Sequence, residues 1–292
     1  TGDKKYIDML ELSFENAMLA SIYRDGKWGA RVLRGNSRHT VAVAQCSFKY
    51  NHCCVNNIPR GMLNVAEMIV TTKENDLYVN LYTPAEITLN NATVTISEGY
   101  IQNQTVTVKV NCEKAQKIFF RIPNWSNFAI INGKKTINND QYFCVDAKIG
   151  ENEFNLEFDH SLRVIEPHNG THNFPSTLIS PISNYMLDRL LDSNDINKKI
   201  IPTTDNRARL MIGPILLAKS KFFGSCSKDL FESKSIYKKD FILSAEVASF
   251  NEVRAAFKIT YSDNGENKAF YVGDYAWVSN LSKEEEMFSI YM

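Results

Sequence analysis

The chain has 292 residues, of which 44% are hydrophobic and 23% charged, as is usual for a folded globular protein of about two domains. Its 33 Lys and Arg residues balance its 33 Asp and Glu residues, so bulk charge indicates neither nucleic acid nor an anionic membrane as a partner. No apolar run reaches the roughly 18–20 residues of a membrane span, and six cysteines in a chain of this length do not make a disulfide scaffold.

The first predicted element is a helix over residues 3–22, which ends near Asp25-Gly26. Asp3 can cap it, because its side-chain oxygen can accept a hydrogen bond from an unpaired N–H of the first turn. Such a helix needs packing partners and few other helices follow it, so we expect the chain to be the C-terminal part of a longer protein. The helical spacing predicts one buried apolar face, made of Tyr6, Met9, Leu10, Phe14 and Ala17.

A second helix is predicted over residues 58–71, after an irregular hairpin or loop at residues 27–50. Its apolar residues recur at mostly helical spacing, and Pro59 fits a first turn, where its missing N–H would be unpaired in any case. The prediction therefore places the adjacent cysteines, Cys53 and Cys54, just ahead of the helix.

The pair Cys53 and Cys54 is the main candidate for chemistry. Thiols close to a helix N-terminus feel the positive end of the helix dipole, which favours the thiolate. Thiolate is the form that attacks carbon and binds metal. Other interpretations stay open at this point: two buried and inert cysteines, a strained disulfide between neighbours, or half of a metal site whose other ligands lie elsewhere.

From residue 77 onward the pattern changes to short runs rich in β-branched and aromatic residues. Residues 105–110 alternate strictly, so one face of that strand is buried. Turn signals separate the runs, and Asn132-Gly133 is a strong signal for a hairpin. Regularly spaced short strands of this kind indicate a β-sandwich or jelly-roll-like domain. The predicted strands are residues 77–82, 86–89, 93–97, 105–110, 117–122, 128–131, 142–145, 154–158 and 162–165.

The rest of the chain is less regular. Residues 166–207 are polar and are predicted as a long loop with a short helix at residues 184–191. Residues 207–220 read as a strand, and residues 221–239 as a linker. The last part adds a hairpin turn at residues 263–265 and strands at residues 241–247, 255–261, 270–272 and 288–291.

Several short blocks occur along the chain in a fixed order. They are Thr1-Gly2-Asp3-Lys4-Lys5-Tyr6-Ile7-Asp8-Met9-Leu10-Glu11, Phe14-Glu15-Asn16-Ala17-Met18-Leu19-Ala20-Ser21, Asp25-Gly26, His52-Cys53-Cys54-Val55-Asn56-Asn57-Ile58-Pro59-Arg60, Leu77-Tyr78-Val79-Asn80-Leu81-Tyr82, Phe120-Arg121-Ile122-Pro123-Asn124-Trp125 and Ile131-Asn132-Gly133. In this order and spacing they resemble the β-L-arabinofuranosidase family, glycoside hydrolase family 127 and its relatives. The resemblance runs from residue 1 to about residue 218, and the series of blocks carries it rather than any single block.

The resemblance implies a mixed, mainly β fold. Residues 1–75 would be the last helices of an (α/α) catalytic barrel. Residues 76–220 would form an antiparallel, jelly-roll-like β-sandwich, and residues 221–292 an additional β-rich region.

The resemblance also implies a retaining glycoside hydrolase that acts on an oligosaccharide or glycoside and releases L-arabinofuranose or a related sugar. Cys53 would be the nucleophile, and Cys53 and Cys54 would both contribute to a Zn²⁺ site. In the family the acid/base Glu and the other zinc ligands, a Glu and a Cys two residues apart, precede the first block. We therefore expect an incomplete zinc site in this chain and no activity of the fragment alone.

Two further residues bear on the sugar. Glu11 matches a family glutamate near the sugar hydroxyls, although a helix Glu is more often a solvated surface residue. After the Asp25-Gly26 turn the family has an aromatic Phe-Phe-Tyr run whose Tyr reaches the site, whereas this chain has Lys27-Trp28-Gly29-Ala30-Arg31. The sugar specificity therefore stays open, and His52 is expected to make local hydrogen bonds.

The remaining cysteines and the tryptophan of the Arg121 block are expected to be structural. Cys112 and Cys144 fall in or beside strands as small packing residues, while Cys46 and Cys226 match no ligand block. Trp125 is expected in a core rather than stacked on a sugar. The alternative function is a non-catalytic β-sandwich that binds carbohydrate or serves as a scaffold, favoured slightly by the missing aromatic run.

Overall fold

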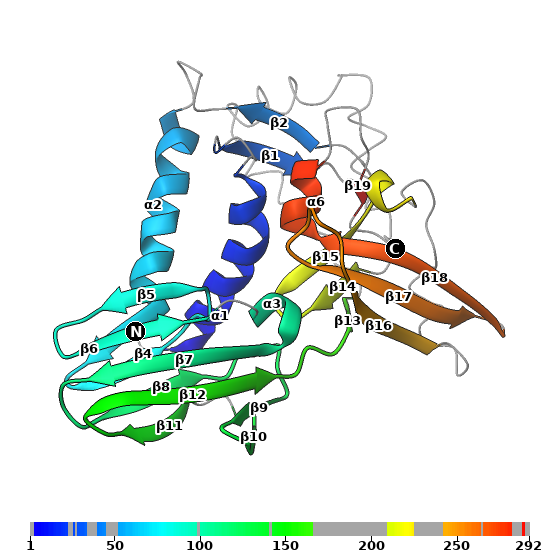
Figure 1. Cartoon of the computed structure of the whole chain (residues 1–292). Coiled ribbons are helices and arrows are strands. Elements are labelled where there is room, and N and C mark those ends of the chain that lie inside the picture. The colour runs from blue at the N-terminus through cyan, green and yellow to red at the C-terminus, as the bar shows by residue number, and fades with distance from the viewer. Residues whose placement is uncertain are drawn as a thin grey trace, which may run out of the picture.

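The structure of the chain is a computed structural model that describes residues 3–22, 26, 28–33, 40–44, 52–97, 100–139, 142–165, 209–224, 242–263, 265–281 and 288–289. Two long helices stand side by side on one edge, and two β units lie against them (Figure 1). The predicted loop at residues 166–207 with its short helix, most of the predicted linker, and Cys46 and Cys226 lie outside the described residues. No described helix combines the length and the apolarity needed to cross a membrane.

The first helix begins where predicted, but the set of residues that it buries differs from the predicted one. α1 (Lys4–Leu12) continues into a π-helical segment, η1 (Ser13–Met18), and Asp3 accepts a hydrogen bond from the Lys5 N–H at 3.0 Å. The expected apolar face is right in part. Phe14 is buried and Leu10 packs against the core, but Tyr6 is 51% exposed, Met9 is 63% exposed and Ala17 is exposed. The buried residues of α1 are Lys4, Asp8 and Glu11, because this face meets a buried arginine and backbone carbonyls of the sandwich.

The second helix begins earlier than predicted. α2 (His52–Ile69) contains Pro59 in its interior instead of in its first turn. Proline inside a helix loses one backbone hydrogen bond, and the packing of Val65 and Ile69 in the core outweighs that local cost. Cys53 and Cys54 therefore belong to the first turn of α2 instead of preceding the helix. Gly61 packs closely on η1, because an added Cβ would lie 2.5 Å from Cε of Met18.

The predicted hairpin before α2 is present. β1 (Gly29–Leu33) and β2 (Thr40–Ala44) pair antiparallel, at the end of the helix pair that is far from the sandwich (Figure 1). This hairpin lies beside the first turn of α2 in the same view.

A β-sandwich follows, as predicted. One sheet has the strand order β10-β9-β12-β7-β6-β5, and the other has the order β11-β8-β4-β3. All neighbours are antiparallel except β4 and β8, which run parallel. The short helix α3 (Tyr100–Asn103) lies between β6 and β7. The strands are β3 (Val70–Lys73), β4 (Asp76–Val79), β5 (Ala85–Thr88), β6 (Ala92–Ile96), β7 (Thr105–Cys112), β8 (Gln116–Arg121), β9 (Phe128–Ile131), β10 (Lys134–Ile137), β11 (Tyr142–Ala147) and β12 (Gly150–Phe158).

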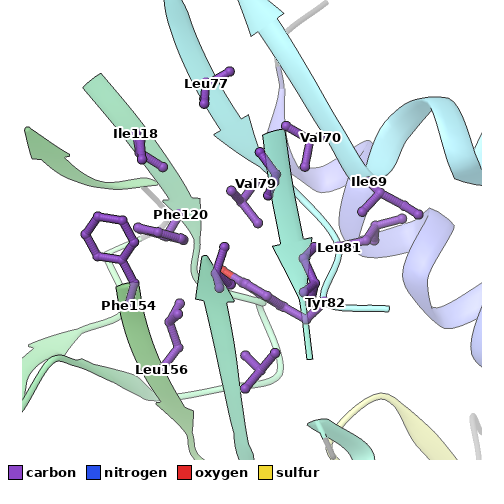
Figure 2. Packing of buried hydrophobic residues seen from close by; sticks show 14 of the residues in the cluster. Ile69, Val70, Leu77, Val79, Leu81, Tyr82, Ile118, Phe120, Phe154 and Leu156 are labelled. Carbon is purple, nitrogen blue, oxygen red and sulfur yellow. The ribbon is translucent and has the colours of Figure 1, made fainter. Parts of the chain in front are cut away.

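The core of the sandwich fills the space between the two sheets. Phe120 from one sheet and Phe154 from the other have ring centroids 5.1 Å apart, and Val79, Ile118 and Leu156 surround them (Figure 2). The alternation predicted for residues 105–110 is confirmed, since every second residue of β7 is buried. Ile69 of α2 belongs to the same cluster, so the helices and the sandwich share one core.

Two local features of the sandwich test predictions made from the sequence, one for a hairpin and one for two cysteines. The Asn132-Gly133 hairpin is confirmed, with φ of 48° and 80° at the two residues, and it leads into β10, which had not been predicted. Cys112 is buried as expected, but Cys144 is exposed, so its packing role was wrong. Cys144 lies on β11, which is an edge strand with one face open to solvent.

A third sheet completes the described fold, in the order β13-β14-β15-β18-β17-β16, with β19 paired to β15. The expected domain division at residue 220 cuts through this sheet, because β15 ends at Ser220 and pairs with β18. The helix α6 (Tyr275–Leu281) packs on β15 and η1. The strands are β13 (Arg163–Ile165), β14 (Arg209–Ile212), β15 (Ile215–Ser220), β16 (Ile242–Ala248), β17 (Ala256–Asp263), β18 (Glu266–Asp274) and β19 (Phe288–Ser289), and a 3-10 turn, η3 (Lys221–Phe223), follows β15.

Candidate functional site

The cysteine pair occupies the N-terminal turn of α2, at the end of the helix that points away from the sandwich (Figure 1). Backbone N–H groups in the first turn of a helix have no partner within the helix, and their summed dipole stabilises a nearby negative charge. The position of Cys53 and Cys54 therefore favours thiolate, as the sequence reading expected from a place just ahead of the helix. The side chains of both cysteines and of His52 lie outside the described part of the structure.

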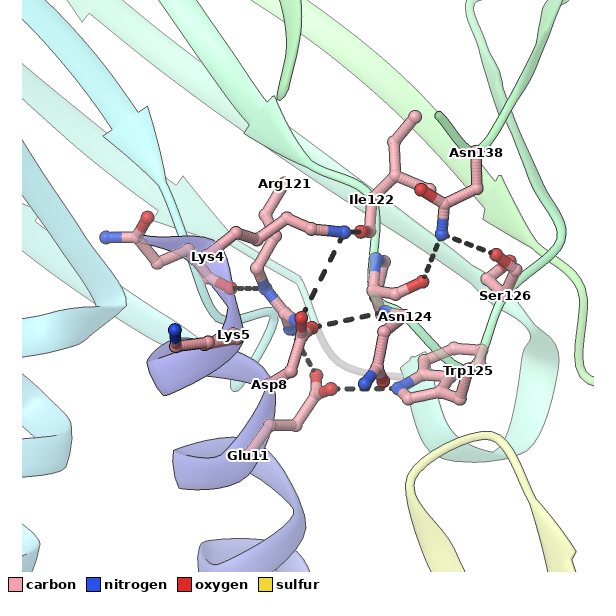
Figure 3. A network of polar contacts seen from close by, with 12 residues as sticks. Lys4, Lys5, Asp8, Glu11, Arg121, Ile122, Asn124, Trp125, Ser126 and Asn138 are labelled. Atoms are coloured by element: carbon pink, nitrogen blue, oxygen red, sulfur yellow. Dashed lines mark hydrogen bonds and ion pairs between the residues drawn. The ribbon is translucent and has the colours of Figure 1, made fainter. Parts of the chain in front are cut away.

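Glu11 lies in a buried polar network between α1 and the sandwich (Figure 3). Its Oε1 accepts hydrogen bonds from Arg121 Nη2 at 2.6 Å and from the Tyr100 hydroxyl at 3.0 Å. Its Oε2 accepts from Trp125 Nε1 at 2.8 Å. Only 2% of Glu11 is exposed, so its carboxylate is fully engaged by protein groups.

Arg121 is the centre of this network. Its Nη1 donates to Asp8 Oδ1 at 2.5 Å, and its Nε donates to the carbonyl of Asn80. Lys4 adds a second cation, 4.0 Å from Asp8, and donates to the carbonyl of Ile122 at 2.7 Å (Figure 3). Two cations thus face two carboxylates without an excess of charge, which is the condition under which buried ion pairs are tolerated.

Electrostatics in the network follow from burial and from the neighbouring charges. Burial lowers the pKa of Arg121, but the carboxylates of Glu11 and Asp8 outweigh burial, so the pKa is raised overall. Burial, with Glu11 beside it, raises the pKa of Tyr100 well above its ordinary value. Arg121 is therefore permanently charged and Tyr100 permanently neutral at physiological pH.

The structure does not bring Glu11 and the cysteine pair together. Glu11 is bound to the sandwich, whereas α2 runs from the cysteines to Ile69 in the sandwich core. At 1.5 Å per residue, this run of α2 from Cys53 to Ile69 is about 24 Å long. The role of Glu11 as a sugar contact stays a prediction, and its observed contacts fasten α1 to the sandwich. The structural role expected for Trp125 is confirmed, since the side chain is 5% exposed and hydrogen-bonded.

A second charged cluster escaped the sequence reading. Arg254 donates from Nη1 to Glu15 Oε2 at 2.5 Å and from Nε to Asp274 Oδ2 at 2.6 Å. Glu15 is on η1 and Asp274 ends β18, so the cluster joins the helix to the third sheet. Glu15 and Arg254 are 239 positions apart, and no spacing rule in one sequence connects residues so distant.

A metal site is not tested by the described residues. Among them no group of three or more His, Cys, Asp or Glu side chains could hold a metal ion. The side chains of the two candidate ligands, Cys53 and Cys54, are not among the described ones. The donor set itself fits zinc in part, since thiolates are preferred zinc ligands and the pair supplies two of the three or four that a site needs.

Comparison with known structures defines the class of protein. The whole chain superposes on a GH127 β-L-arabinofuranosidase from Geobacillus stearothermophilus T6, with a TM-score of 0.65, 19% identity and 46% of that chain covered. It also superposes on a structure described as a glycoside hydrolase, with a TM-score of 0.64, 18% identity and 49% of that chain covered. A GH127 β-arabinofuranosidase gives a TM-score of 0.62 at 16% identity, over 46% of that chain. At these identities the likeness establishes the fold alone.

The match to a protein family lies in the sandwich. Residues 76–159 match the family model "Beta-L-arabinofuranosidase, GH127 middle domain", and these are the residues of β4 to β12. The resemblance inferred from the ordered blocks is therefore confirmed. No curated protein matches the chain. The chain spans about half the length of the solved structures it resembles.

Proposed function

We propose that the chain is the C-terminal portion of a retaining glycoside hydrolase that releases L-arabinofuranose or a related sugar from a glycoside. The observation that carries the proposal is the GH127 middle domain at residues 76–159, packed in one core with the helix that begins at the cysteine pair. The similar fold of a GH127 β-L-arabinofuranosidase supports it.

In the proposed mechanism Cys53 attacks the anomeric carbon and forms a covalent glycosyl-enzyme intermediate, which water then hydrolyses. The helix N-terminus around Cys53 favours the thiolate that this step needs. Cys54 and Cys53 would hold a zinc ion, whose bound state keeps the thiols deprotonated. A separate carboxylic acid must protonate the leaving oxygen, and we place this acid, with the remaining zinc ligands, before residue 1.

The decisive experiment uses the full-length protein and an electrophilic arabinofuranose analogue. Peptide mass spectrometry should find the label on Cys53 and none on Cys54. Cys144 is the matched control, because it is a free thiol that the reagent can reach. Its partial desolvation raises its pKa and so disfavours the thiolate, and it should stay unlabelled. Cys53→Ser should abolish turnover, since an alcohol is a poor nucleophile without a matched base, while Cys144→Ser should leave turnover unchanged. A labelled carboxylate together with an active Cys53→Ser variant would sink the thiolate mechanism and leave the cysteines a structural role.

Zinc content gives an independent test. Elemental analysis of residues 1–292 should find little zinc, and analysis of the protein with its preceding segment should find about one ion per chain. Equal zinc in both would show that the ligands lie within residues 1–292.

A further inference from the structure

A cavity of about 380 Å³ lies where the three parts of the described fold meet. Phe14, Glu15 and Leu19 form its wall on the first helix, and residues 82–84 and 100–102 form its wall on the sandwich. Arg254 and Trp277 close it from the side of the third sheet. Cavities of this size at the junction of domains are typical places for a small ligand.

The cavity combines an apolar lining with one charged group that has spare hydrogen-bonding capacity. Arg254 uses Nη1 for Glu15 and Nε for Asp274, but its buried Nη2 has no partner among the residues that the structure describes. A buried donor without a partner is unfavourable, and a ligand that accepts from it would remove that cost. The Arg254 guanidinium carbon lies 4.9 Å from the centre of the Trp277 ring, so the donor and an aromatic face are adjacent.

The helix segment at the cavity is irregular as well. Glu15 belongs to η1, a π-helical stretch, and such stretches occur frequently at functional sites. Burial raises the pKa of Glu15 to about 7, although the adjacent Arg254 acts in the opposite direction. Near neutral pH this carboxyl group is therefore able either to donate or to accept a hydrogen bond.

The charges at the wall restrict what the cavity can hold. Arg254 already pairs with the carboxyl groups of Glu15 and Asp274, so an anionic ligand would compete with them for one guanidinium group. A cationic ligand would be repelled by the guanidinium. A purely apolar ligand would leave Nη2 buried without a partner. What remains is a neutral molecule that has hydroxyl groups on its edge and apolar C–H faces.

We propose that this cavity binds a single neutral sugar unit, with a hydroxyl oxygen accepting from Arg254 Nη2 and a C–H face packed on the aromatic lining. Sugars have the required combination of hydroxyl edge and apolar face, and aromatic side chains with one polar neighbour suit such molecules. This site is separate from the cysteine pair. The inference goes beyond the proposed function and stands on observations that do not involve Cys53.

The test is a ligand-observed NMR titration of the whole chain with L-arabinose, D-galactose and D-glucose, each alone. At least one sugar should bind saturably. Thr83→Phe puts a bulky side chain in the lining of the cavity and should weaken binding about tenfold or more. Thr88→Phe, at an exposed position of β5 outside the cavity, should not. Arg254→Lys keeps a positive charge for the carboxylates but removes the free fork nitrogen, and should weaken binding about tenfold.

Two comparisons separate this site from others. D-glucuronate, which carries a carboxylate, should bind at least about tenfold more weakly than D-glucose if D-glucose binds. The two tests are independent, because the described residues that line this cavity do not include Cys53, so a failed labelling experiment at Cys53 leaves this result unaffected. The inference is overturned if no sugar binds saturably, if binding survives Thr83→Phe, or if glucuronate binds as tightly as glucose.

Discussion

The Nη2 atom of Arg121 lies 2.6 Å from Oε1 of Glu11, and both residues are buried, with Arg121 0% exposed and Glu11 2% exposed. This contact joins the first helix to β8 of the sandwich across 110 positions of the chain. It explains why a helix with a charged buried face is stable here: each charge on that face meets an opposite charge or a carbonyl of the sandwich.

Removal of Arg121 should therefore be strongly destabilising. Arg121→Met leaves Asp8 and Glu11 buried without their cation, and breaking a buried pair in this way typically costs about 3–5 kcal/mol. Urea unfolding should show the loss as a lower midpoint. Lys109→Met is the control, because its pair with Glu153 is solvent-exposed and worth less than about 1 kcal/mol. Equal losses in the two variants would contradict the assigned role.

The pH dependence of stability should report on Glu15. Its folded pKa of about 7 lies above the ordinary 4.5, so its contribution to stability is fully present below about pH 4.5 and is lost as the pH rises to about 7. The loss amounts to at most about 3 kcal/mol. In urea unfolding at about pH 5 and about pH 7.5, Glu15→Gln should lose less stability with rising pH than the wild type does.

His160 titrates in both proteins and cancels in the comparison, whereas Asp274 shares Arg254 with Glu15, so the difference between the two slopes reports on the cluster of Glu15, Arg254 and Asp274. A Glu15→Gln slope identical to that of the wild type would mean that Glu15 titrates in the folded protein as it does in the unfolded chain.

Asn16 should couple the helix to the third sheet. Its side-chain amide donates to the Pro214 carbonyl at 2.9 Å, and its side-chain oxygen accepts from the Leu216 N–H at 2.7 Å. Asn16→Ala leaves both backbone groups without these partners and should lower the free energy of unfolding by about 1–3 kcal/mol. Asn127→Ala removes one exposed hydrogen bond to Asp159 and should cost about 1 kcal/mol or less. Thermal unfolding of both variants tests this difference.

Gly213 should tolerate no side chain. It has φ of +54°, and an added Cβ would lie 2.8 Å from Cδ2 of His160, whose ring is buried and hydrogen-bonded to the Phe158 carbonyl. Gly213→Ala should therefore cost about 2–4 kcal/mol, from backbone strain and steric overlap together. Gly265 has φ of +82° with open space around it, so Gly265→Ala should show the strain alone, about 1 kcal/mol. If calorimetry finds the two variants equally stable, the His160 contact is softer than its geometry implies.

Local patterns in the sequence were sufficient for most elements of the sandwich. Asp3 caps its helix, Asn132-Gly133 closes its hairpin, and the alternation in β7 predicts its buried face. Each of these features depends on residues within a few positions of one another. Pro59 misled the reading for the same reason, because its local preference for a first turn is weaker than the tertiary packing of α2.

What sequence reasoning missed depends on distant partners. No local pattern predicts that Lys4, Asp8 and Glu11 form a buried face, because their partners are Arg121 and the Ile122 carbonyl, at least 110 positions away. The cluster of Glu15, Arg254 and Asp274 joins two units that no local pattern relates. Cys53 and Cys54 are candidates because of the ordered blocks around them, and their proposed role is tested by labelling.

The π-helical stretch at Ser13–Met18 has a mechanical consequence for the first helix. In an unbroken α-helix each residue turns about 100°, so Ala20 would point about 160° away from Lys4. One extra residue in a π turn reverses that rotation by about 100° and brings the two onto the same side. Both ends of the helix are buried: Lys4, at 6% exposure, contacts the sandwich, and Ala20, at 1% exposure, packs in the cluster that contains Ala218 and Ala276. A single-residue deletion in this stretch would therefore rotate one end of the helix relative to the other. Either the contacts of the helix with the sandwich or its contacts with the third sheet would then be lost.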